Sequence, residues 1–511
     1  MTIATPPWRV VILGGGTAGW LSAALLSRKL GRRVSITLVE SAEIGTVGVG
    51  EGTFPTIRTT LASLGVSEAD FLRASDATFK QGVLFDGWAT GMDSYFHPFN
   101  LPYGGSEPGL LPYWLADRGK RQSYAAAVTA QEDVARANLG PKRIEDPDFG
   151  GPMNYAYHFD AVRFAAFLRS CAEGGGVERI EATVDDVAKH ENGDIAALTL
   201  SDERRVDGDF FLDCSGFRAR LIGEAMGARF VGVGDVLFND RAMAVQVPDE
   251  APCVPIRPYT LATAQRSGWT WDIGLSTRRG IGHVYSSRHS SDDEAEVVLR
   301  SYLGATGKSI EPRMLRFETG YRERQWIGNC AAVGLSAGFF EPLESTGISL
   351  IEYALLLLTD MIGTRDRAAR EGAARRFNVL MTERFKRAVD FLKLHYCITQ
   401  RTDTVYWRDN ADPASIPQTL RDRLAQWRER PPSRFDFDLD RETFLPASYQ
   451  YVLYGMGFAT EVEGLSGNSH AAGARAAFAK VREAAAGAVR HLPDHRALLD
   501  NLAHRSLIAV R

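Results

Sequence analysis

Cysteine is scarce in this chain of 511 residues, and its distribution argues against the usual cysteine-based scaffolds. The cysteines are odd in number, widely spaced and free of any CxxC pair: Cys171, Cys214, Cys253, Cys330 and Cys397. Disulfide frameworks and zinc sites are built from paired cysteines at short, regular spacings. We therefore expect neither of them, and a reducing compartment fits this cysteine usage.

Long apolar runs are also missing. No stretch reaches the roughly 18 uninterrupted apolar residues that indicate a membrane-spanning helix. The most apolar stretch, residues 348–362, contains Glu352 and Asp360, which favours a buried helix instead. The N-terminus shows no basic region, apolar core and small-residue cleavage site of the signal-peptide type. We therefore expect a cytoplasmic protein without a membrane segment.

Charge of one sign is not in excess. Lys and Arg total 59 against 63 Asp and Glu, a net charge of −4, and no long basic run is present. This balance argues against nucleic acid as the main partner. Apolar residues make up 45% and charged residues 24%, which is globular composition and excludes a disordered, collagen-like or coiled-coil chain.

A glycine-rich turn near the N-terminus is the first positive signal. The β-branched run Arg9–Leu13 predicts a buried parallel strand, and it is followed at once by Gly14-x-Gly16-x-x-Gly19 and a helical pattern over residues 20–30. A second strand over residues 34–39 ends in Glu40. This order predicts a βαβ unit whose glycines approach a pyrophosphate at the helix start, with Glu40 on a ribose. A tight turn without a ligand is the alternative.

A second glycine-rich stretch, residues 329–338, lies far down the chain. It predicts a strand that ends in glycines before a helix. In flavoproteins such a segment brings main-chain amides to the ribityl and isoalloxazine part of FAD, whereas the alternative is a packed strand-turn-helix. The other elements that we expect are a helix at 160–171, a hairpin at 195–200 feeding a buried strand at 209–213, second-sheet strands at 236–247 and 270–285, and helices at 352–362, 368–395 and 473–488.

Four segments resemble the tryptophan-halogenase family of flavin-dependent halogenases. The resemblance is clear from Val10 to about Trp407 and weaker in the tail. The segments are Ile12–Trp20, Phe79-Lys80-Gln81-Gly82, Gly268-Trp269-Thr270-Trp271-Asp272-Ile273-Gly274 and Gly338-Phe339-Phe340-Glu341-Pro342-Leu343-Glu344-Ser345-Thr346-Gly347-Ile348. The third segment is similar to the family's WxWxIP signature but ends in Gly274 where the family has proline, which we expect to loosen the backbone there.

The resemblance implies a fold and a cofactor. The expected fold class is α/β: a Rossmann-like FAD-binding module of the GR2 type, a second β-sheet over the flavin and a helical C-terminal region. We expect the module, with an inserted halide and substrate region, at residues 1–365, and a C-terminal region that completes the substrate site at 366–511. FAD, used as FADH2, would contact Gly14, Gly16, Thr17, Ala18, Gly19, Glu40, Val184, Leu335 and Ile348.

The resemblance also implies the reaction. Reduced FAD and O2 oxidise chloride or bromide to hypohalous acid, with the halide held by Thr346 and Gly347 at a helix start. Lys80 then holds the hypohalous acid by hydrogen bonding or as a haloamine, and Glu344 stabilises the arenium intermediate and accepts its proton. The residues alone allow simpler roles: Lys80 on a solvated helix face, Glu344 as a capping carboxylate, and Ser345 and Thr346 as helix caps.

Substrate recognition is less defined. His97 and Phe99 look like the family's aromatic slot, in which Phe99 stacks on a flat ring and His97 orients it. Trp269 and Trp271 alternate on a strand and are expected to point to one face, as walls of a tunnel or as packing residues. Tyr449, Tyr451 and Tyr454 align with no family position that grips an amino-acid group. Free indole, tryptophan and other electron-rich aromatics therefore stay open.

Two other functions remain to be weighed. An aromatic hydroxylase that binds NAD(P)H itself usually has an acidic residue after the glycine of the second FAD segment and an Asp-Gly pair in a middle strand. Here Leu335 follows Gly334, and Ser215 precedes Gly216. These differences imply a separate flavin reductase that supplies FADH2 by diffusion. A non-catalytic flavoprotein is the other rival and would need neither Lys80 nor Glu344. The sequence leaves a homodimer open.

Overall fold

The computed structural model describes residues 6–42, 50–105, 109–117, 122–249, 254–461 and 471–508. The chain divides into two compact units, each made of three separate stretches. Unit 1 comprises Met1–Ser75, Phe159–Val233 and Phe317–Phe385; unit 2 comprises Asp76–His158, Gly234–Arg316 and Lys386–Arg511. Each unit is described below by itself, and the boundary expected at residue 365 stays a prediction.

Unit 1 contains the predicted nucleotide-binding sheet. Among its described residues, six strands lie in the order β20, β21, β12, β1, β2, β8, and all neighbours are parallel except β20 and β21. The β-branched residues of β1 are buried between two neighbours, as a central parallel strand requires. In spatial order the strands are β20 (Trp326–Ile327), β21 (Cys330–Ala332), β12 (Phe210–Asp213), β1 (Trp8–Leu13), β2 (Val34–Glu40) and β8 (Glu178–Glu181).

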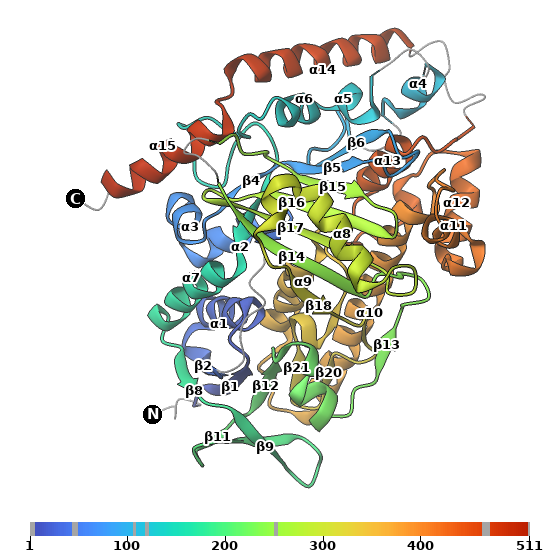
Figure 1. Cartoon of the computed structure of the whole chain (residues 1–511). Coiled ribbons are helices and arrows are strands. Elements are labelled where there is room, and N and C mark those ends of the chain that lie inside the picture. The colour runs from blue at the N-terminus through green and yellow to red at the C-terminus, as the bar shows by residue number, and fades with distance from the viewer. Residues whose placement is uncertain are drawn as a thin grey trace. The chain divides into compact units, whose positions relative to one another are not determined.

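Helices α1 and α7 pack against each other beside this sheet (Figure 1). Helix α1 (Thr17–Leu30) is rich in alanine and leucine and ends at Gly31, whose φ of 53° suits glycine. Helix α7 (Ala161–Gly174) begins after Asp160, whose carboxylate accepts hydrogen bonds from the N–H groups of Val162 and Arg163. Helix α9 (Thr346–Met361) also packs on α1.

The remaining elements of unit 1 are short. Strands β9, β10 and β11 form one antiparallel sheet, and β13, β19 and β22 form another. Their bounds, with the other elements of the unit, are β3 (Gly50–Gly52), α2 (Thr56–Leu64), α3 (Glu68–Ala74), β9 (Val184–Lys189), β10 (Ile195–Leu200), β11 (Arg205–Asp207), the turns η3 (Gly216–Arg218) and η4 (Arg220–Ala225), β13 (Phe230–Gly232), β19 (Gly320–Arg322), η6 (Gly334–Ser336) and β22 (Gly338–Phe339).

Unit 2 is built on a larger, mainly antiparallel sheet. In its described part seven strands lie in the order β18, β14, β17, β16, β15, β5, β6, and only β15 and β5 run parallel. A separate antiparallel pair joins β4 (Thr78–Lys80) to β7 (Ala156–Asp160). The sheet strands are β18 (Arg313–Arg316), β14 (Arg241–Pro248), β17 (Arg278–Tyr285), β16 (Gly268–Gly274), β15 (Thr260–Ala264), β5 (Gly82–Asp86) and β6 (Ser94–Pro98).

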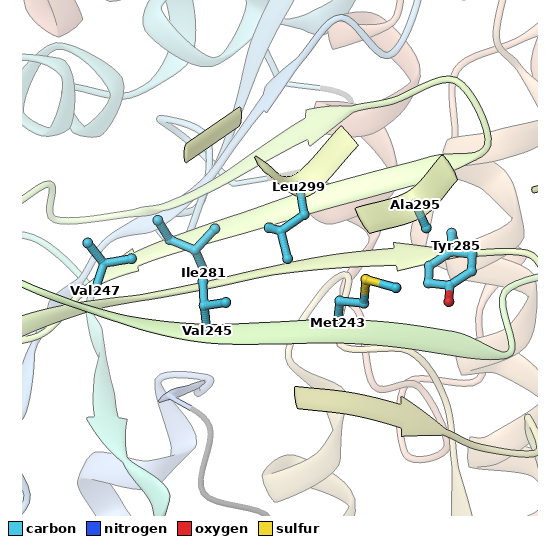
Figure 2. Close-up of a cluster of buried hydrophobic side chains, with 7 residues drawn as sticks. All are labelled: Met243, Val245, Val247, Ile281, Tyr285, Ala295 and Leu299. Atoms are coloured by element: carbon cyan, nitrogen blue, oxygen red, sulfur yellow. The ribbon is translucent and has the colours of Figure 1, made fainter. Parts of the chain in front are cut away.

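The sheet of unit 2 buries one face under helix α8 (Asp292–Leu303) (Figure 2). Alternate residues of β14, namely Met243, Val245 and Val247, point to the same side and meet Leu299 of the helix. Ser291 and Glu294 form a capping box that fixes where this helix begins. The core of this part therefore follows from strand alternation and a strong helix start signal.

The C-terminal part of the chain is helical, as predicted. Helix α10 continues from unit 1 into unit 2. The other helices of unit 2 differ in length, from the five residues of α5 to the 21 residues of α14, which runs along the top of the view (Figure 1). The bounds are α4 (Leu111–Ala116), α5 (Tyr124–Val128), α6 (Gln131–Arg136), α10 (Arg367–Cys397), α11 (Val405–Ala411), α12 (Gln418–Glu429), α13 (Pro446–Gly455), α14 (Ala471–His491) and α15 (His495–Ile508).

The fold class is confirmed as mixed α/β with a Rossmann-like parallel sheet and a helical C-terminal region. The two stretches expected as strands of a second sheet do lie in the sheet of unit 2, but with different bounds. Residues 236–240 lie before β14, which begins at Arg241, because a turn follows Gly234. The stretch 270–285 forms two antiparallel strands, β16 and β17, separated by residues 275–277, where the Thr277 hydroxyl donates a hydrogen bond to Asp76.

One expectation about unit 1 needs correction. The helix that contains the stretch 352–362 begins at Thr346, where a helix start was expected for the halide. The glycine segment at 329–338 does not lead directly into that helix: β21 is followed by the 3-10 turn η6 and then by strand β22. The positive φ of Gly334, 76°, turns the chain there.

Candidate functional site

The first glycine turn follows β1 and can be formed only by glycine at two positions. Gly14 has a φ of 117°, and a Cβ atom there would overlap the carbonyl of Cys214. A Cβ atom at Gly19 would overlap the carbonyl oxygen of Gly14. Gly16 differs, because a Cβ there would meet nothing within 4 Å. The turn is therefore tightly packed on one side and open on the other.

The open side of the turn lies at the start of helix α1. Gly16 is the N-cap and provides no side-chain capping bond, so the first N–H groups of α1 depend on another acceptor. The N–H groups of a helix start attract anions, and a pyrophosphate is the ligand that this cradle fits. Thr17 and Ala18 form the first turn of the same helix. These residues fit the phosphate part of FAD.

Glu40 lies next to this turn at the end of β2. Its Oε2 occupies the place where a Cβ atom of Gly15 would be, so the carboxylate is in contact with the glycine turn. Its Oε1 accepts a hydrogen bond of 2.5 Å from Nε of Arg179. The N–H of Ala182 donates to the carbonyl of Glu40, which places Val184, the first residue of β9, two residues further along the same segment.

The second glycine segment meets the first. A Cβ atom at Gly334 would lie 2.6 Å from the Cβ of Ala18, so η6 packs directly on the beginning of α1. Leu335 is half-buried in that 3-10 turn, and Ile348 is buried in the first turn of α9. The structure thus brings two segments more than 300 residues apart in sequence to one place in unit 1.

The segment expected to hold the halide begins helix α9. Its N-cap, Ser345, has a left-handed conformation with a φ of 57° and makes no side-chain capping bond. The capping interpretation of Ser345 is therefore wrong. A Cβ atom at Gly347 would meet nothing within 4 Å, whereas Thr346 is buried. A helix start with open space beside it fits a small anion. Glu344, just before it, is 1% exposed.

Two further carboxyl groups of unit 1, to which no functional role was assigned from the sequence, have raised pKa values. Burial raises the pKa of Glu352 to about 7, although the hydroxyls of Thr56 and Thr60 donate hydrogen bonds to it. Burial, and then the nearby charge of Asp160, raises the pKa of Glu51 to about 7. The position of Glu352 inside an apolar run was the sequence signal from which its burial and raised pKa could have been predicted.

In unit 2, Lys80 ends the short strand β4 and is fully buried. The solvated helix face that the residues alone allowed is therefore wrong. One edge of β4 pairs with β7, and on the other the N–H of Phe79 donates to Nε2 of His495 at 3.2 Å. Nζ of Lys80 lies 5.4 Å from the ring centroid of Phe99, within cation–π range.

His97 and Phe99, the two residues expected to line the aromatic slot, are connected to the segment of Lys80 by strand pairing and by a main-chain hydrogen bond. His97 pairs with Val83 across β5 and β6, is 3% exposed, and its ring centroid lies 6.0 Å from that of Tyr451. Phe99 is half-buried, and its N–H donates to the carbonyl of Gln81. Unit 2 therefore brings Lys80 and Phe99 together, with His97 on the adjoining strand.

The two tryptophans of β16 are both buried, with ring centroids 6.3 Å apart, so they point to one face as expected. A Cβ atom at Gly282 would overlap the ring of Trp271, which makes glycine necessary there. Gly274 does not loosen the strand end. Its carbonyl accepts a hydrogen bond of 2.6 Å from the Thr78 hydroxyl, and a Cβ there would lie 2.7 Å from Ile256.

Unit 1 also contains a polar cavity that lies away from the glycine turn. This cavity of about 790 Å³, lined among others by Arg9 and Arg370, lies at the opposite end of β1 from the glycine turn. Both arginines form ion pairs, Arg9 with Asp209 and Arg370 with Asp194.

In the part of the chain that the structure describes, no cluster of histidine, cysteine or acidic residues suits a metal ion, and no helix has the length and apolarity to cross a membrane.

Four of the five cysteines lie in the described part of the chain. Cys171, Cys214, Cys330 and Cys397 are free thiols. Cys253 lies outside the described residues. Burial raises the pKa of the Cys214 thiol, so this group stays protonated next to the glycine turn.

Comparison with known proteins gives one consistent result. Residues 9–468 match the family model described as tryptophan halogenase. A tryptophan 6-halogenase of Streptomyces toxytricini is 35% identical over 471 residues, covering 88% of this chain and 90% of the relative. The crystal structure of a tryptophan halogenase from Shewanella frigidimarina superimposes with a TM-score of 0.94 at 39% identity, covering 98% of each chain. A flavin-dependent halogenase from Brevundimonas superimposes with a TM-score of 0.86 at 36% identity, covering 98% and 100%.

Proposed function

Since this chain belongs to the tryptophan halogenase family, whose members are flavin-dependent halogenases, we propose that it halogenates an electron-rich aromatic ring of the indole or tryptophan type. FADH2, O2 and chloride or bromide are the co-reactants of this proposal. The single observation that carries it is Lys80, a fully buried lysine above the ring of Phe99. Burial penalises the charge of a lysine, so a lysine held in this position is a candidate for a chemical role.

The cofactor and the halide are assigned to unit 1. The turn Gly14–Gly19 holds the pyrophosphate of FAD, Glu40 the ribose, and Val184, Leu335 and Ile348 contact the rest of the cofactor. When bound and reduced, the flavin supplies two electrons, so that FADH2, O2, a halide ion and a proton give FAD, hypohalous acid and water. The start of α9 at Thr346 and Gly347 holds the halide through main-chain N–H groups, which the open space beside Gly347 supports.

Lys80 is the group that receives the hypohalous acid. As an ammonium it donates a hydrogen bond to the acid's oxygen and makes the halogen a better electrophile; as an amine it exchanges a proton for the halogen and releases water. In both routes the halogen is held at Nζ of Lys80. The pairing of β4 with β7 positions the main chain of this lysine. Fixing the reactive group in this way reduces the entropy cost of the transfer.

Glu344 completes the substitution. Addition of the halogen to the ring gives an arenium cation, and the Glu344 carboxylate stabilises this charge and takes the proton that the ring releases. Its 1% exposure supports the assignment, because a carboxylate shielded from water interacts more strongly with a nearby cation. Overall, the aromatic C–H and hypohalous acid give the C–halogen bond and water.

The substrate is assigned to the aromatic surroundings of Lys80. Phe99 stacks on the ring, His97 orients it, and Trp269 and Trp271 line the tunnel. Two tail tyrosines bond within the protein: the Tyr451 hydroxyl donates to the carbonyl of Asn100, and the Tyr454 hydroxyl bonds to Thr460. No residue is assigned to an amino-acid group, so indole, tryptophan and other electron-rich aromatics all stay substrate candidates.

The FADH2 supply and the assembly are also part of the proposal. A separate flavin reductase provides FADH2 by diffusion, because the chain has Leu335 after Gly334 and Ser215 before Gly216 where self-reducing hydroxylases have acidic residues. We propose that the protein acts in the cytoplasm. We also propose that residues 366–511 complete the substrate site. A homodimer stays open to measurement.

The decisive experiment measures product mass. The protein is incubated with FAD, a flavin reductase, NADH, O2 and either chloride or bromide, with indole or tryptophan as substrate, and Lys80→Met serves as the matched control. A halogen isotope pattern that the control lacks supports the proposal. A hydroxylated product would instead favour the runner-up, a flavin-dependent aromatic monooxygenase. Bound FAD with unreacted substrates across an aromatic panel would indicate a non-catalytic flavoprotein.

A further inference from the structure

His158 lies on the strand that pairs with the strand of Lys80. In the antiparallel pair of β4 and β7, His158 is opposite Thr78 and Lys80 is opposite Ala156. Residues opposite each other, and residues two apart on one strand, share a face. The side chains of Lys80 and His158 therefore lie on the same face as diagonal neighbours, a separation that long side chains bridge.

The ring of His158 is fully buried, and its two nitrogens have different surroundings. Nε2 lies 2.8 Å from Oγ1 of Thr260 on β15. Nδ1 has no hydrogen-bond partner among the described residues and is shielded from solvent. A buried polar atom without a partner is energetically unfavourable, so such an atom calls for a physical explanation.

The charges around His158 decide which nitrogen carries its proton. Burial lowers the pKa of His158 well below its usual value, and the positive charge of Lys80 lowers it further, so the ring is neutral. His495 is neutral too, since burial lowers its pKa to about 4. Next to the Lys80 ammonium, a lone pair on Nδ1 is favoured over an N–H dipole. Nε2 then carries the hydrogen and donates it to Thr260.

We propose that His158 is a positioning residue for Lys80, with Nδ1 accepting a hydrogen bond from a water molecule that also accepts one from the ammonium group of Lys80. This bridge holds Nζ in the place from which the halogen is delivered. Thr260 selects the tautomer by accepting the hydrogen of Nε2. The inference rests on the proposed function for its consequence in catalysis, whereas the hydrogen bond itself is a property of unit 2 alone.

Two substitutions separate the nitrogens of His158. In His158→Asn the amide occupies the position of Nδ1, and in His158→Gln it reaches the position of Nε2. We expect His158→Asn to keep kcat within about threefold and His158→Gln to lower it by about tenfold or more, because small displacements of a reacting group reduce turnover strongly. The KM for the aromatic substrate stays unchanged in both. The reverse order, or equal losses in both variants, would overturn the proposal.

His289 provides the matched control. It is also a histidine of unit 2 with a buried ring, but both its nitrogens have partners, Ser286 Oγ at 2.9 Å and Asp409 Oδ2 at 3.0 Å. His289→Asn and His289→Gln should lower the melting temperature and leave kcat as it is. A loss of kcat in this pair equal to that in the His158 pair would show a general effect of replacing buried histidines and would overturn the proposal.

A spectroscopic measurement tests the hydrogen bond without turnover. In ¹⁵N-histidine-labelled protein, we expect His158 to show a protonated Nε2 and an unprotonated Nδ1, with the Nδ1 shift moving in Lys80→Met. His158→Asn identifies the resonances. A protonated Nδ1, or a shift that Lys80→Met leaves unchanged, would overturn the inference. If the wild type halogenates nothing, the proposed function fails, and this spectrum still decides on His158.

Discussion

The two units build their sites in different ways. In unit 1 the candidate cofactor site consists of main-chain groups at two helix or turn starts, made possible by glycines such as Gly14 and Gly334. In unit 2 the surroundings of Lys80 consist of side chains from distant parts of the chain; His495 contacts Phe79 across 416 residues. The main-chain site depends on local conformation, whereas the side-chain site depends on the complete fold of its unit.

The units also differ in how their buried groups respond to pH. Unit 1 holds carboxyl groups whose pKa is raised to about 7, Glu51 and Glu352. Unit 2 holds histidines whose pKa is lowered to about 4, His283 and His495. Burial favours the neutral form in every case, but the consequences are opposite. These two carboxyl groups stabilise unit 1 less as the pH rises, and these two histidines destabilise unit 2 as the pH falls.

The largest effect on activity is expected from removing the Lys80 amino group of unit 2, a change that leaves the main-chain cofactor site of unit 1 intact. Lys80→Met keeps the length of the buried side chain and removes its nitrogen. We expect halogenation to fall by roughly 100-fold or more, the usual scale for a group acting on the transferred atom. FAD affinity, measured by fluorescence titration, should stay within about twofold. A parallel loss of FAD binding would contradict the separation of roles.

The next effect tests the main-chain site with two neighbouring glycines. Gly16→Ala adds a methyl group where a Cβ meets nothing, and Gly19→Ala adds one that overlaps the carbonyl of Gly14. We expect both to weaken FAD binding by about tenfold or more, roughly 1.4 kcal/mol. Only Gly19→Ala should also lower the melting temperature of the FAD-free protein.

Equal melting temperatures for the two glycine variants would mean that the clash at Gly19 relaxes without cost. Normal FAD binding by Gly16→Ala would mean that the open space beside Gly16 is not the path of the pyrophosphate. The two measurements therefore test the packed side and the open side of the turn independently.

The same contrast explains what the sequence could and could not predict. The strand before Gly14, helix α1 and strand β2 were predicted within a few residues, because their signals are local. The contact of Gly334 with Ala18 was only implied by family resemblance. The neighbours of Lys80 were missed: His158 and His495 have no spacing relation to it, and only the β4–β7 register and the docking of α15 bring them near.

A smaller effect concerns the pH dependence of unit 2. The pKa of His495 is about 4 in the folded protein and about 6.5 when unfolded. Between these values the unfolded chain binds more protons, so stability falls as the pH drops from 6.5 to 4. The full window corresponds to a loss on the order of 3 kcal/mol. His495→Gln keeps an acceptor for Phe79 N–H and removes the titration, so its melting temperature should fall less between pH 6.5 and pH 5.

The control for this prediction is His491→Gln, which changes an exposed histidine. That variant should reproduce the pH dependence of the wild type. A His495→Gln protein whose melting temperature falls as steeply as that of the wild type would show that His495 is not held neutral in the folded protein.

An effect of similar size and opposite sign is expected in unit 1. The pKa of Glu352 is about 7 in the folded protein, above the unfolded value of about 4.5, so the folded state retains a proton that the unfolded state releases. The stabilisation is complete below pH 4.5 and is lost as the pH rises through 7. Glu352→Gln imitates the protonated acid and still accepts hydrogen bonds from Thr56 and Thr60. Its melting temperature should match the wild type at pH 5 and exceed it by a growing margin up to pH 8, whereas a constant difference would contradict the raised pKa.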